Sequence, residues 1–360
     1  MVSVSRRNRM GYKKYQGRGS AGSFFLKVLV CILAVLVVGD AGFLLAKQDE
    51  FSLPSLPTFQ DHTAQSTQDT QEDPAPATQE VSESQTPEAT PSPTVSPKPQ
   101  MTEIRAVEVT VDQLLDGSAQ RRVEQAGCSA LVVEVKDRSG HLKWPSQVAK
   151  AQEWGAVSGQ KSLTDALKSL SDQGIYLVAR VDCLRDQLLA GLNVENSVLV
   201  TKSGRRWYDF WGMSWVSPMS QTVRDYLEQV CVELSQMGFD ELVLSGAHYP
   251  DEGEVYALAQ SSIYPGDRTT SVELLWQELS TALADSGVVL SAQVRGESVV
   301  DGGTVTGLTP ELLKKYAQRV WVTTQDVEQS QVDAALTQAG IQAAGQMARQ
   351  SANSGQTIWE

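Results

Sequence analysis

The sequence predicts an α/β fold: a (β/α)8 barrel of the TIM type, preceded by one transmembrane helix and a disordered linker. Short apolar runs alternate with amphipathic helical segments from residue 104 to residue 360. Near-continuous apolar strands separated by helices are typical of a parallel sheet that helices cover from outside. The length of this region suits such a barrel, which typically has ~250 residues.

The N-terminal segments predict a membrane anchor. Residues 1–23 form a basic tail, in which "SRRNRMGYKKYQGRG" holds six positive charges and no acid. Residues 24–46 (FFLKVLVCILAVLVVGDAGFLLA) are apolar enough and long enough to cross a bilayer as a helix. The basic flank predicts that the tail stays in the cytoplasm and that the rest of a single-pass protein lies outside the cell membrane.

A cleaved signal peptide is the alternative interpretation of residues 24–46. Small residues at the −3 and −1 positions of a cleavage site are not evident after Leu44, Leu45 and Ala46, which favours an uncleaved anchor. The next segment, 47–103, contains nine of the 14 prolines and ten acidic residues. It cannot bury enough apolar surface to fold, so we expect a disordered linker that holds the barrel away from the membrane.

Charge and composition exclude several classes of partner. The first 47 residues contribute +7 to the net charge of −13, which leaves −20 for the rest of the chain. Such an acidic body predicts no nucleic-acid partner. The three histidines are too few and too dispersed for a multi-histidine zinc site, so we expect no metal and no cofactor.

Three cysteines lie outside the apolar segment, at positions 128, 183 and 231. Their spacing is not that of a metal site. We expect unpaired thiols that pack as small apolar groups, with a single disulfide as the alternative.

The barrel region, 104–360, divides into eight expected strands. Six are strong, at 104–109, 130–135, 175–181, 241–245, 288–293 and 318–322. Two are weaker, at 340–346 and 355–359, and the second of these is expected to close the barrel at the end of the chain. Clear amphipathic helices fall at 161–173, 219–237 and 271–286.

Glycines mark the boundaries between these helices and strands. Gly174, Gly238 and Gly287 each follow a helix and precede a strand, where a left-handed cap is expected. A doubly wound open sheet is the alternative architecture. No G-x-G-x-x-G follows the first strand, which disfavours a nucleotide-binding version of that sheet.

Four stretches resemble a bacterial glycoside-hydrolase-like family, long catalogued as a domain of unknown function. The stretches are "ALVVEVKDRSGHLKWPS" (130–146), "GIYLVARVDCLRD" (174–186), "RRWYDFWGMSWVSPMSQTVRDYLEQV" (205–230) and "GFDELVLSGAHYP" (238–250). The resemblance covers essentially all of 104–360, is strong up to residue 250 and fades afterwards. It implies a TIM barrel related to amylase-like hydrolases and a polysaccharide or cell-wall glycan as the partner.

Individual positions carry this resemblance. A family pattern after the second strand, "IDVKDD-G", is matched by Glu134, Lys136, Asp137 and Gly140. The pattern "IAR…FKD" of the third strand is matched by Ala179, Arg180, Arg185 and Asp186. The loop pattern "W-D…WV-P" is matched by Trp207, Asp209, Trp215, Val216 and Pro218.

The chain departs from the family at the ends of its fourth and fifth strands. Ser245 stands where the family pattern "FDYVRFP" has an aspartate, and His248 stands where it has an arginine. Gln293, in "SAQVRG", stands at the aspartate of "SADVFG". Glycoside hydrolysis uses two carboxyl groups, and neither serine nor glutamine supplies one.

The expected site follows from these matches and departures. If catalysis persists, a relocated acid pair is expected among the acids near the predicted strand ends, and the catalytic candidates chosen from them are Glu134, Asp137 and Asp209. The full set of these acids is Glu134, Asp137, Asp182, Asp186, Asp209, Asp251, Glu252 and Glu297. Each of these acids has a simpler interpretation as a solvated charge or an ion pair, for instance Asp137 with Arg180. The candidate substrate-binding residues are Trp207, Trp211, Trp215, His248, Arg180, Ser245 and Gln293. The tryptophans offer flat faces on which sugar rings stack, although a hydrophobic plug under a long loop is equally consistent with them.

Two functional hypotheses remain open at this stage. The first is a membrane-anchored extracytoplasmic glycoside hydrolase that acts on polysaccharide through a displaced acid pair. The second is a catalytically inactive barrel that binds glycans or partners in the cell envelope.

Overall fold

The computed structural model describes residues 103–353 and 356–360, which form one barrel domain. The predicted basic tail, membrane anchor and linker lie outside these residues. Within the described residues, the longest and most apolar helices still fall short of what a membrane crossing requires.

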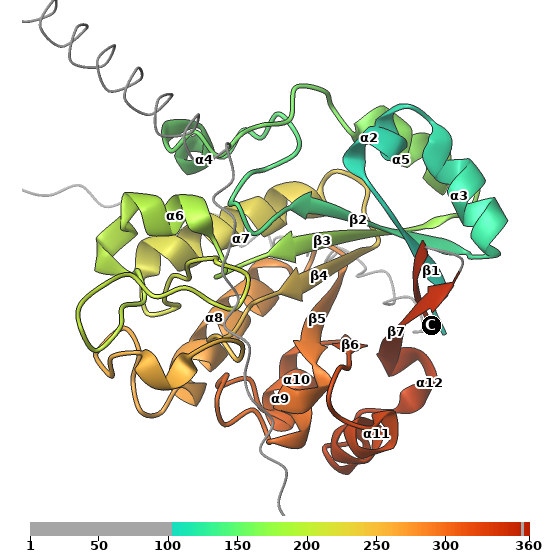
Figure 1. Cartoon of the computed structure of the whole chain (residues 1–360). Coiled ribbons are helices and arrows are strands. Elements are labelled where there is room, and N and C mark those ends of the chain that lie inside the picture. The colour runs from blue at the N-terminus through green and yellow to red at the C-terminus, as the bar shows by residue number, and fades with distance from the viewer. Residues whose placement is uncertain (1–102, 354–355) are drawn as a thin grey trace, which may run out of the picture. The chain divides into compact units, whose positions relative to one another are not determined.

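Eight strands close into a barrel in chain order, as Figure 1 shows. The strands are β1 (Ala106–Val109), β2 (Ala130–Lys136), β3 (Tyr176–Asp182), β4 (Glu241–Ser245), β5 (Val289–Arg295), β6 (Arg319–Thr323), β7 (Met347–Asn353) and β8 (Gln356–Trp359). The six strongly predicted strands are confirmed to within two residues at either end, and the barrel closes at 356–359 as expected.

Two expectations about the last strands are wrong. Strand seven was expected at 340–346, but this segment holds a helical turn, α12 (Ala343–Gln346), and β7 begins after it. The backbone turns at Gly345, which has a φ of +75°. Because β7 reads "MARQSAN", it lacks the apolar signal that revealed the other strands.

The barrel is also not wholly parallel. β1 to β7 pair in parallel, whereas β8 runs antiparallel to both β7 and β1. Since only two residues of the sequence separate β7 from β8, the chain has no room for the crossover helix that a parallel strand needs. The fold is therefore a TIM-like barrel that a C-terminal hairpin completes.

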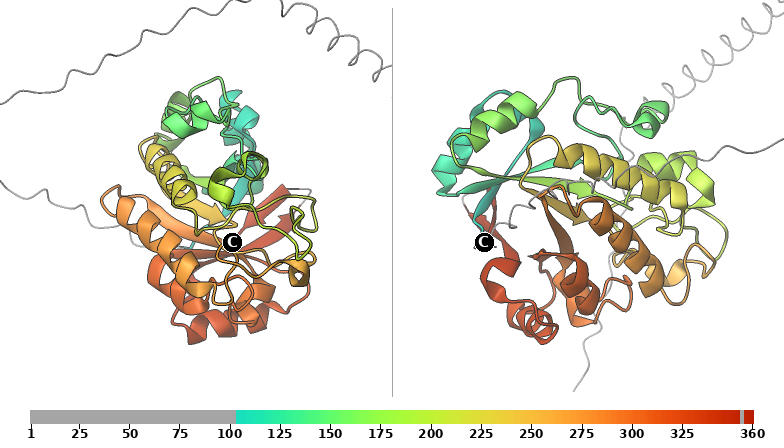
Figure 2. Two further views of the ribbon diagram at one scale, coloured as in Figure 1. Left: turned by 90° about the vertical axis from the view of Figure 1, so that its left-hand side faces the viewer. Right: turned by 180° about the vertical axis from the view of Figure 1, so that it is seen from behind.

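Helices and helical turns surround the barrel, as Figure 2 shows from two further sides. They are α2 (Val111–Leu115), α3 (Ser118–Ala126), α4 (Ala149–Glu153), α5 (Thr164–Ser171), α6 (Gln187–Leu192), η2 (Val194–Asn196), α7 (Gln221–Ser235), η3 (Val255–Ala257), α8 (Thr269–Ala282), α9 (Gly296–Val300), α10 (Pro310–Tyr316), α11 (Gln329–Gln338) and α12. Gly174, Gly238 and Gly287 have φ values of +77°, +101° and +78°, which confirms the expected left-handed caps.

The layer between strands and helices is the main hydrophobic core. On α7, the buried residues Val223, Leu227, Val230 and Leu234 recur at spacings of three and four, the pattern of a helix that packs one face inward. Cys183 and Cys231 are buried thiols and Cys128 is partly buried, and all three are free. The expectation of unpaired cysteines is confirmed.

The barrel interior mixes aromatic side chains with charged ones. Trp321 and Trp359 pack edge to face with their ring centroids 5.0 Å apart. Glu241 accepts hydrogen bonds from Arg319, from Trp321 Nε1 at 2.7 Å and from Tyr176 Oη at 3.1 Å. These buried polar groups are thus satisfied by one another, which is the condition for keeping charges inside a barrel.

Candidate functional site

The carboxyl ends of the parallel strands meet at one mouth of the barrel. In Figure 1 the arrowheads of β2, β3 and β4 point to the same side of the domain. The register places Asp182 beside Ser245 and Ser245 beside Gln293, so these three residues form a row across β3, β4 and β5. In TIM barrels the active site is built at this end.

A cavity of about 410 Å³ opens above this row and is called the mouth pocket here. Its size falls in the range of about 300–1,000 Å³ that ligand sites occupy. Its lining comes from β4 to β7, from the loops that follow β2, β3, β4 and β6, and from the first turn of α9 (Gly296–Val300). Five predicted binding residues line it: Trp211, Trp215, Ser245, His248 and Gln293.

The β4 end is shaped by a close backbone approach. Gly246 has a φ of +59°, and a Cβ atom at this position would lie 2.8 Å from Asp182 Oδ1. Glycine therefore lets β4 turn away directly after Ser245 while the Asp182 carboxylate lies against it. This accounts for the glycine that follows Ser245.

His248 packs under the rim of the mouth pocket. Its side chain is buried, and its ring lies 5.9 Å from the Trp215 ring. The Nδ1–H donates to the Tyr249 carbonyl oxygen at 2.6 Å, because a carbonyl can only accept. In the neutral ring this leaves Nε2 as the acceptor, suited to a ligand hydroxyl.

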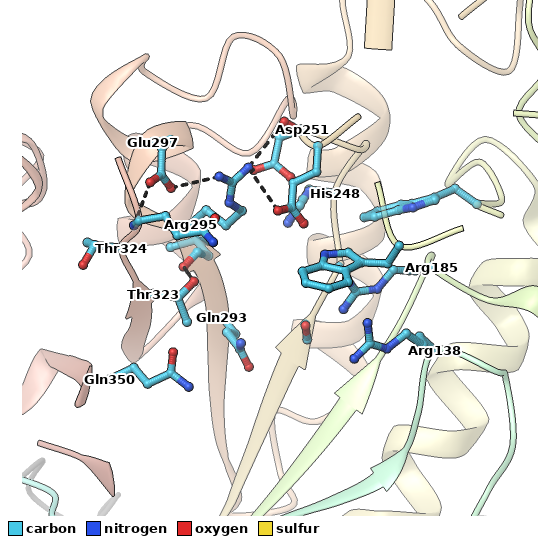
Figure 3. A pocket seen from close by; sticks show the side chains of 17 residues that line it. Arg138, Arg185, His248, Asp251, Gln293, Arg295, Glu297, Thr323, Thr324 and Gln350 are labelled. Atoms are coloured by element: carbon cyan, nitrogen blue, oxygen red, sulfur yellow. Dashed lines mark hydrogen bonds and ion pairs between the residues drawn. The ribbon is translucent and has the colours of Figure 1, made fainter. Parts of the chain in front are cut away.

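Three carboxylates line the mouth pocket, and all three converge on Arg295 (Figure 3). The Arg295 guanidinium lies 3.8 Å from Asp251, 3.6 Å from Glu252 and 3.4 Å from Glu297. Asp251 also accepts a hydrogen bond from Ser298. Each carboxylate in this group, called the Arg295 cluster here, is thus engaged by a cation.

Glu297 is held in its ionised form. Burial alone would raise its pKa, but the backbone N–H groups of Asp326 and Gln325, together with the Arg295 charge, outweigh burial and lower the pKa. Those N–H groups donate to Glu297 Oε1 at 2.7 Å and 2.9 Å. A carboxyl group with a lowered pKa is poorly suited to donate a proton near neutral pH.

Asp182 is a buried acid just beside this pocket. Its Oδ2 accepts from Arg185 Nε at 3.0 Å and from Nη2 at 2.6 Å, while its Oδ1 is buried without a hydrogen-bond partner. Burial raises the pKa of Asp182 against the opposing charge of Arg185. The residue is placed to orient Arg185, whose guanidinium lies 5.8 Å from the Trp215 ring.

The three predicted catalytic acids do not line the mouth pocket. Glu134 lies on β2 and pairs with Lys143 at 3.1 Å and with Arg180 at 3.4 Å. Asp137 lies in the loop after β2 and pairs with Lys143 at 3.4 Å. The ion pair considered between Asp137 and Arg180 is wrong, because Arg180 points into the barrel toward Glu108 and Glu134.

Asp209 organises residues 207–215, the part of the segment between β3 and β4 that holds five aromatic side chains and is called the aromatic loop here. Its Oδ1 accepts from the backbone N–H groups of Trp211 and Met213, each at 2.9 Å, and its Oδ2 accepts from Trp215 Nε1 at 3.0 Å. A carboxylate that accepts three hydrogen bonds within its own loop fixes the shape of that loop. Its position in the "W-D…WV-P" pattern is accounted for by this geometry.

The aromatic loop separates into buried and exposed members. Trp207 and Trp215 are buried, and Trp207 Nε1 donates to the Glu254 carbonyl oxygen at 3.0 Å. Tyr208, Phe210 and Trp211 are 49%, 72% and 53% exposed. Of the expected stacking residues, Trp207 is therefore a plug under the loop, while Trp211 is half exposed and packs edge to face with Phe210, with the ring centroids 5.2 Å apart.

Several residues that line the pocket were not predicted from the sequence. Arg138, Arg295, Thr323, Thr324 and Gln350 line it but were not among the candidates. Arg295 could have been predicted from the sequence, because it follows Gln293 by two residues and so lies on the same face of β5. Gln350 could not, because β7 itself was predicted at the wrong residues. In the described part of the chain, no group of three or more His, Cys, Asp or Glu residues could hold a metal ion.

Comparisons with solved structures find several similar chains. The chain is similar to a hypothetical protein from Ruminiclostridium thermocellum ATCC 27405, with 23% identity, coverage of 52% of this chain and 96% of that chain, and a TM-score of 0.45. It is similar to the PgaB (BpsB) glycoside hydrolase domain from Bordetella bronchiseptica, with 15% identity, coverage of 66% and 81%, and a TM-score of 0.45.

A third similar structure is the GH20 β-N-acetylhexosaminidase from Streptomyces coelicolor A3(2), with 14% identity, coverage of 65% of this chain and 46% of that chain, and a TM-score of 0.42. No curated protein sequence matches the chain. The model of a protein family described as "Putative glycosyl hydrolase domain" matches residues 105–313, from β1 into α10. This match covers more than half of the chain, which therefore belongs to that glycosyl-hydrolase-like family.

Proposed function

We propose that the barrel binds saccharide in its mouth pocket without hydrolysing glycosidic bonds. We further propose that residues 24–46 anchor it in the cell membrane with the barrel outside. Membership of a glycosyl-hydrolase-like family supports carbohydrate as the ligand class. The charge bias and the apolar stretch of the N-terminal segment support the anchor.

The state of the carboxylates is the observation that carries this proposal. Glycoside hydrolysis needs one carboxyl group as a proton donor and a second as base or nucleophile, on opposite sides of the scissile bond. In the mouth pocket the three lining carboxylates share Arg295, while the strand-end positions 245 and 293 are neutral. The pocket thus has the size of a ligand site. Its carboxylates do not form an acid pair, because all three are paired with Arg295.

The remaining groups suit binding. Trp211 offers an exposed aromatic face at the rim, on which a pyranose ring can stack. Ser245, Gln293 and His248 offer neutral donors and acceptors for hydroxyl groups. A few polar groups with an aromatic wall are the usual composition of a specific small-ligand site.

Binding and turnover are tested together on the full-length chain in detergent. Binding to immobilised glycans would be measured beside the release of reducing ends from the same glycans over several days. We expect binding without release. Release that disappears in Asp251→Asn or Glu297→Gln would overturn the proposal and identify the Arg295 cluster as a relocated acid pair.

Topology needs a separate experiment. Protease added to intact protoplasts should remove the barrel if it lies outside the membrane. A barrel that stays protected until the cells are lysed would overturn the proposed orientation.

A further inference from the structure

Two arginines reach into the mouth pocket from the same side. Figure 3 shows Arg138, from the loop after β2, and Arg185, from the loop after β3, with both guanidinium groups directed into the cavity. Gln293 and Gln350 project from the opposite wall. The Arg295 cluster occupies the upper rim in this view.

The two arginines differ in how they are held. Arg185 is fixed by two hydrogen bonds to Asp182 and packs on the Trp215 ring. Arg138 is exposed, and no hydrogen bond or ion pair engages its guanidinium within residues 103–353 and 356–360. Of the two arginines only Arg185 has a carboxylate partner, because both hydrogen bonds to Asp182 Oδ2 come from Arg185.

This imbalance favours an anion between the arginines. Like charges directed into one cavity repel, and the repulsion is relieved when a carboxylate or phosphate accepts from both. A guanidinium presents donors in a planar fork that matches such an anion in bidentate fashion. The Arg295 cluster offers no comparable anion site, because three carboxylates already surround its single arginine.

The opposite wall suits the rest of a sugar. Gln293 Oε1 is buried without a hydrogen-bond partner, so it is free to accept from a ligand hydroxyl. Gln350 and Thr323 line the same wall and add further amide and hydroxyl groups. A ring lying between this wall and the arginines would have its hydroxyls on one side and its charged substituent on the other.

We propose that the mouth pocket recognises an acidic saccharide unit, whose anionic group is bound by Arg138 and Arg185 and whose hydroxyls face Gln293. This inference rests on the proposed saccharide-binding function and narrows its ligand class to anionic sugars. The rest of the protein is strongly acidic, so its overall charge would repel an anionic sugar. Selectivity for an anionic sugar therefore depends on the two arginines of the pocket.

The test uses three probes with the full-length chain: a hexuronate trisaccharide, its carboxyl-reduced neutral counterpart, and a disaccharide that carries a phosphate group. Affinities would be measured by calorimetry for the wild type, Arg138→Gln, Arg138→Lys and the control Arg121→Gln, an exposed arginine on α3. We expect the hexuronate to bind at least ten times more tightly than its neutral counterpart. Arg138→Gln should weaken hexuronate binding about 10-fold to 100-fold, Arg138→Lys should recover part of the loss, and Arg121→Gln should change nothing.

The outcomes separate the two proposals. Equal binding of the acidic and neutral trisaccharides, unaffected by Arg138→Gln, would overturn the anionic selectivity and leave saccharide binding intact. No binding of any probe, or of the wider glycan set, would overturn the proposed function itself. Tighter binding of the phosphate probe than of the hexuronate would support the anion site and identify phosphate as the charged group.

Discussion

Lys136 and Asp186 form an ion pair of 2.7 Å with both side chains wholly buried. The two residues belong to different family patterns, those of the second and third strands. A bulge in β2 between Glu134 and Lys136 turns Lys136 outward, into the layer between barrel and helices. Asp186 caps α6 through its Oδ1, which accepts from Leu189 N at 2.8 Å.

This pair explains why position 140 is restricted to glycine. A Cβ atom at residue 140 would lie 2.2 Å from Asp186 Oδ1, so Gly140 leaves room for the carboxylate. Lys136 also donates to the Asp182 carbonyl oxygen at 2.7 Å, which ties the pair to the end of β3. Lys136, Gly140 and Asp186 thus build the scaffold under the mouth pocket and are not part of its lining.

Removing one partner of this pair should be costly. Burial would lower the pKa of Lys136, but the Asp186 charge outweighs burial and raises it, so the ammonium stays charged at and below the ordinary lysine pKa of about 10.4. Lys136→Met would leave Asp186 buried and unpaired, and we expect a loss of about 3–5 kcal/mol in the free energy of unfolding.

Urea denaturation followed by tryptophan fluorescence would measure this loss, because all eight tryptophans lie in the barrel region. Lys150→Met is the control, since the Lys150–Glu153 pair is exposed and should contribute less than about 1 kcal/mol. Equal effects of the two substitutions would contradict the role given to the buried pair.

Glu297 should make the stability of the barrel depend on pH. Its pKa is lowered in the folded protein, so its contribution is complete above the unfolded value of about 4.3 and is lost as pH falls through the folded value. We expect Glu297→Gln to lower the melting temperature at pH 7, and the difference from wild type to narrow as the pH falls below about 4.

Thermal melts between pH 7 and pH 2.5 would test this, with Glu124→Gln on the exposed face of α3 as the control. A difference that stays constant down to pH 2.5 would show that ionisation of Glu297 does not stabilise the loop after β6.

Asp209 should affect both stability and glycan binding by holding the aromatic loop in shape. Asp209→Ala removes the acceptor of two backbone N–H groups and one indole N–H, and we expect a loss of about 1–3 kcal/mol in unfolding free energy together with weaker glycan binding. Asp209→Asn keeps one oxygen acceptor and should fall between the alanine variant and wild type. If Asp209→Asn left stability and binding unchanged but removed a hydrolytic activity, Asp209 would be a catalytic acid instead.

The sequence predicted the barrel well because its strands carry a local signal. β2, β3 and β4 are apolar runs bounded by helices and glycine caps, and each was located within one or two residues. β7 carried no such signal, because a polar strand becomes visible only through its pairing with β6 and β8.

The site was harder to predict, because side chains from four strands and from several loops meet only in three dimensions. Ser245, Gln293, His248, Trp211 and Trp215 were found from family positions and aromatic content, and all five line the mouth pocket. Arg138 was not among the candidates, because nothing local in the sequence distinguishes it from the exposed Arg121. The convergence of three acids on Arg295 depends on the register of β4 and β5 and on the paths of the loops after them.

Trp207 and Trp211 lie four residues apart in the same loop and should respond in opposite ways to alanine substitution. Trp207 is 2% exposed and hydrogen-bonded, so Trp207→Ala should cost about 3–5 kcal/mol in unfolding free energy. Trp211 is 53% exposed at the rim of the mouth pocket, so Trp211→Ala should change stability by less than about 0.5 kcal/mol. Trp211→Ala should also weaken glycan binding about tenfold or more, because it removes the exposed aromatic ring on which a sugar would stack. Urea denaturation and calorimetry on both variants would decide this. If Trp211→Ala left the glycan affinity unchanged, the glycan would have to bind outside the mouth pocket.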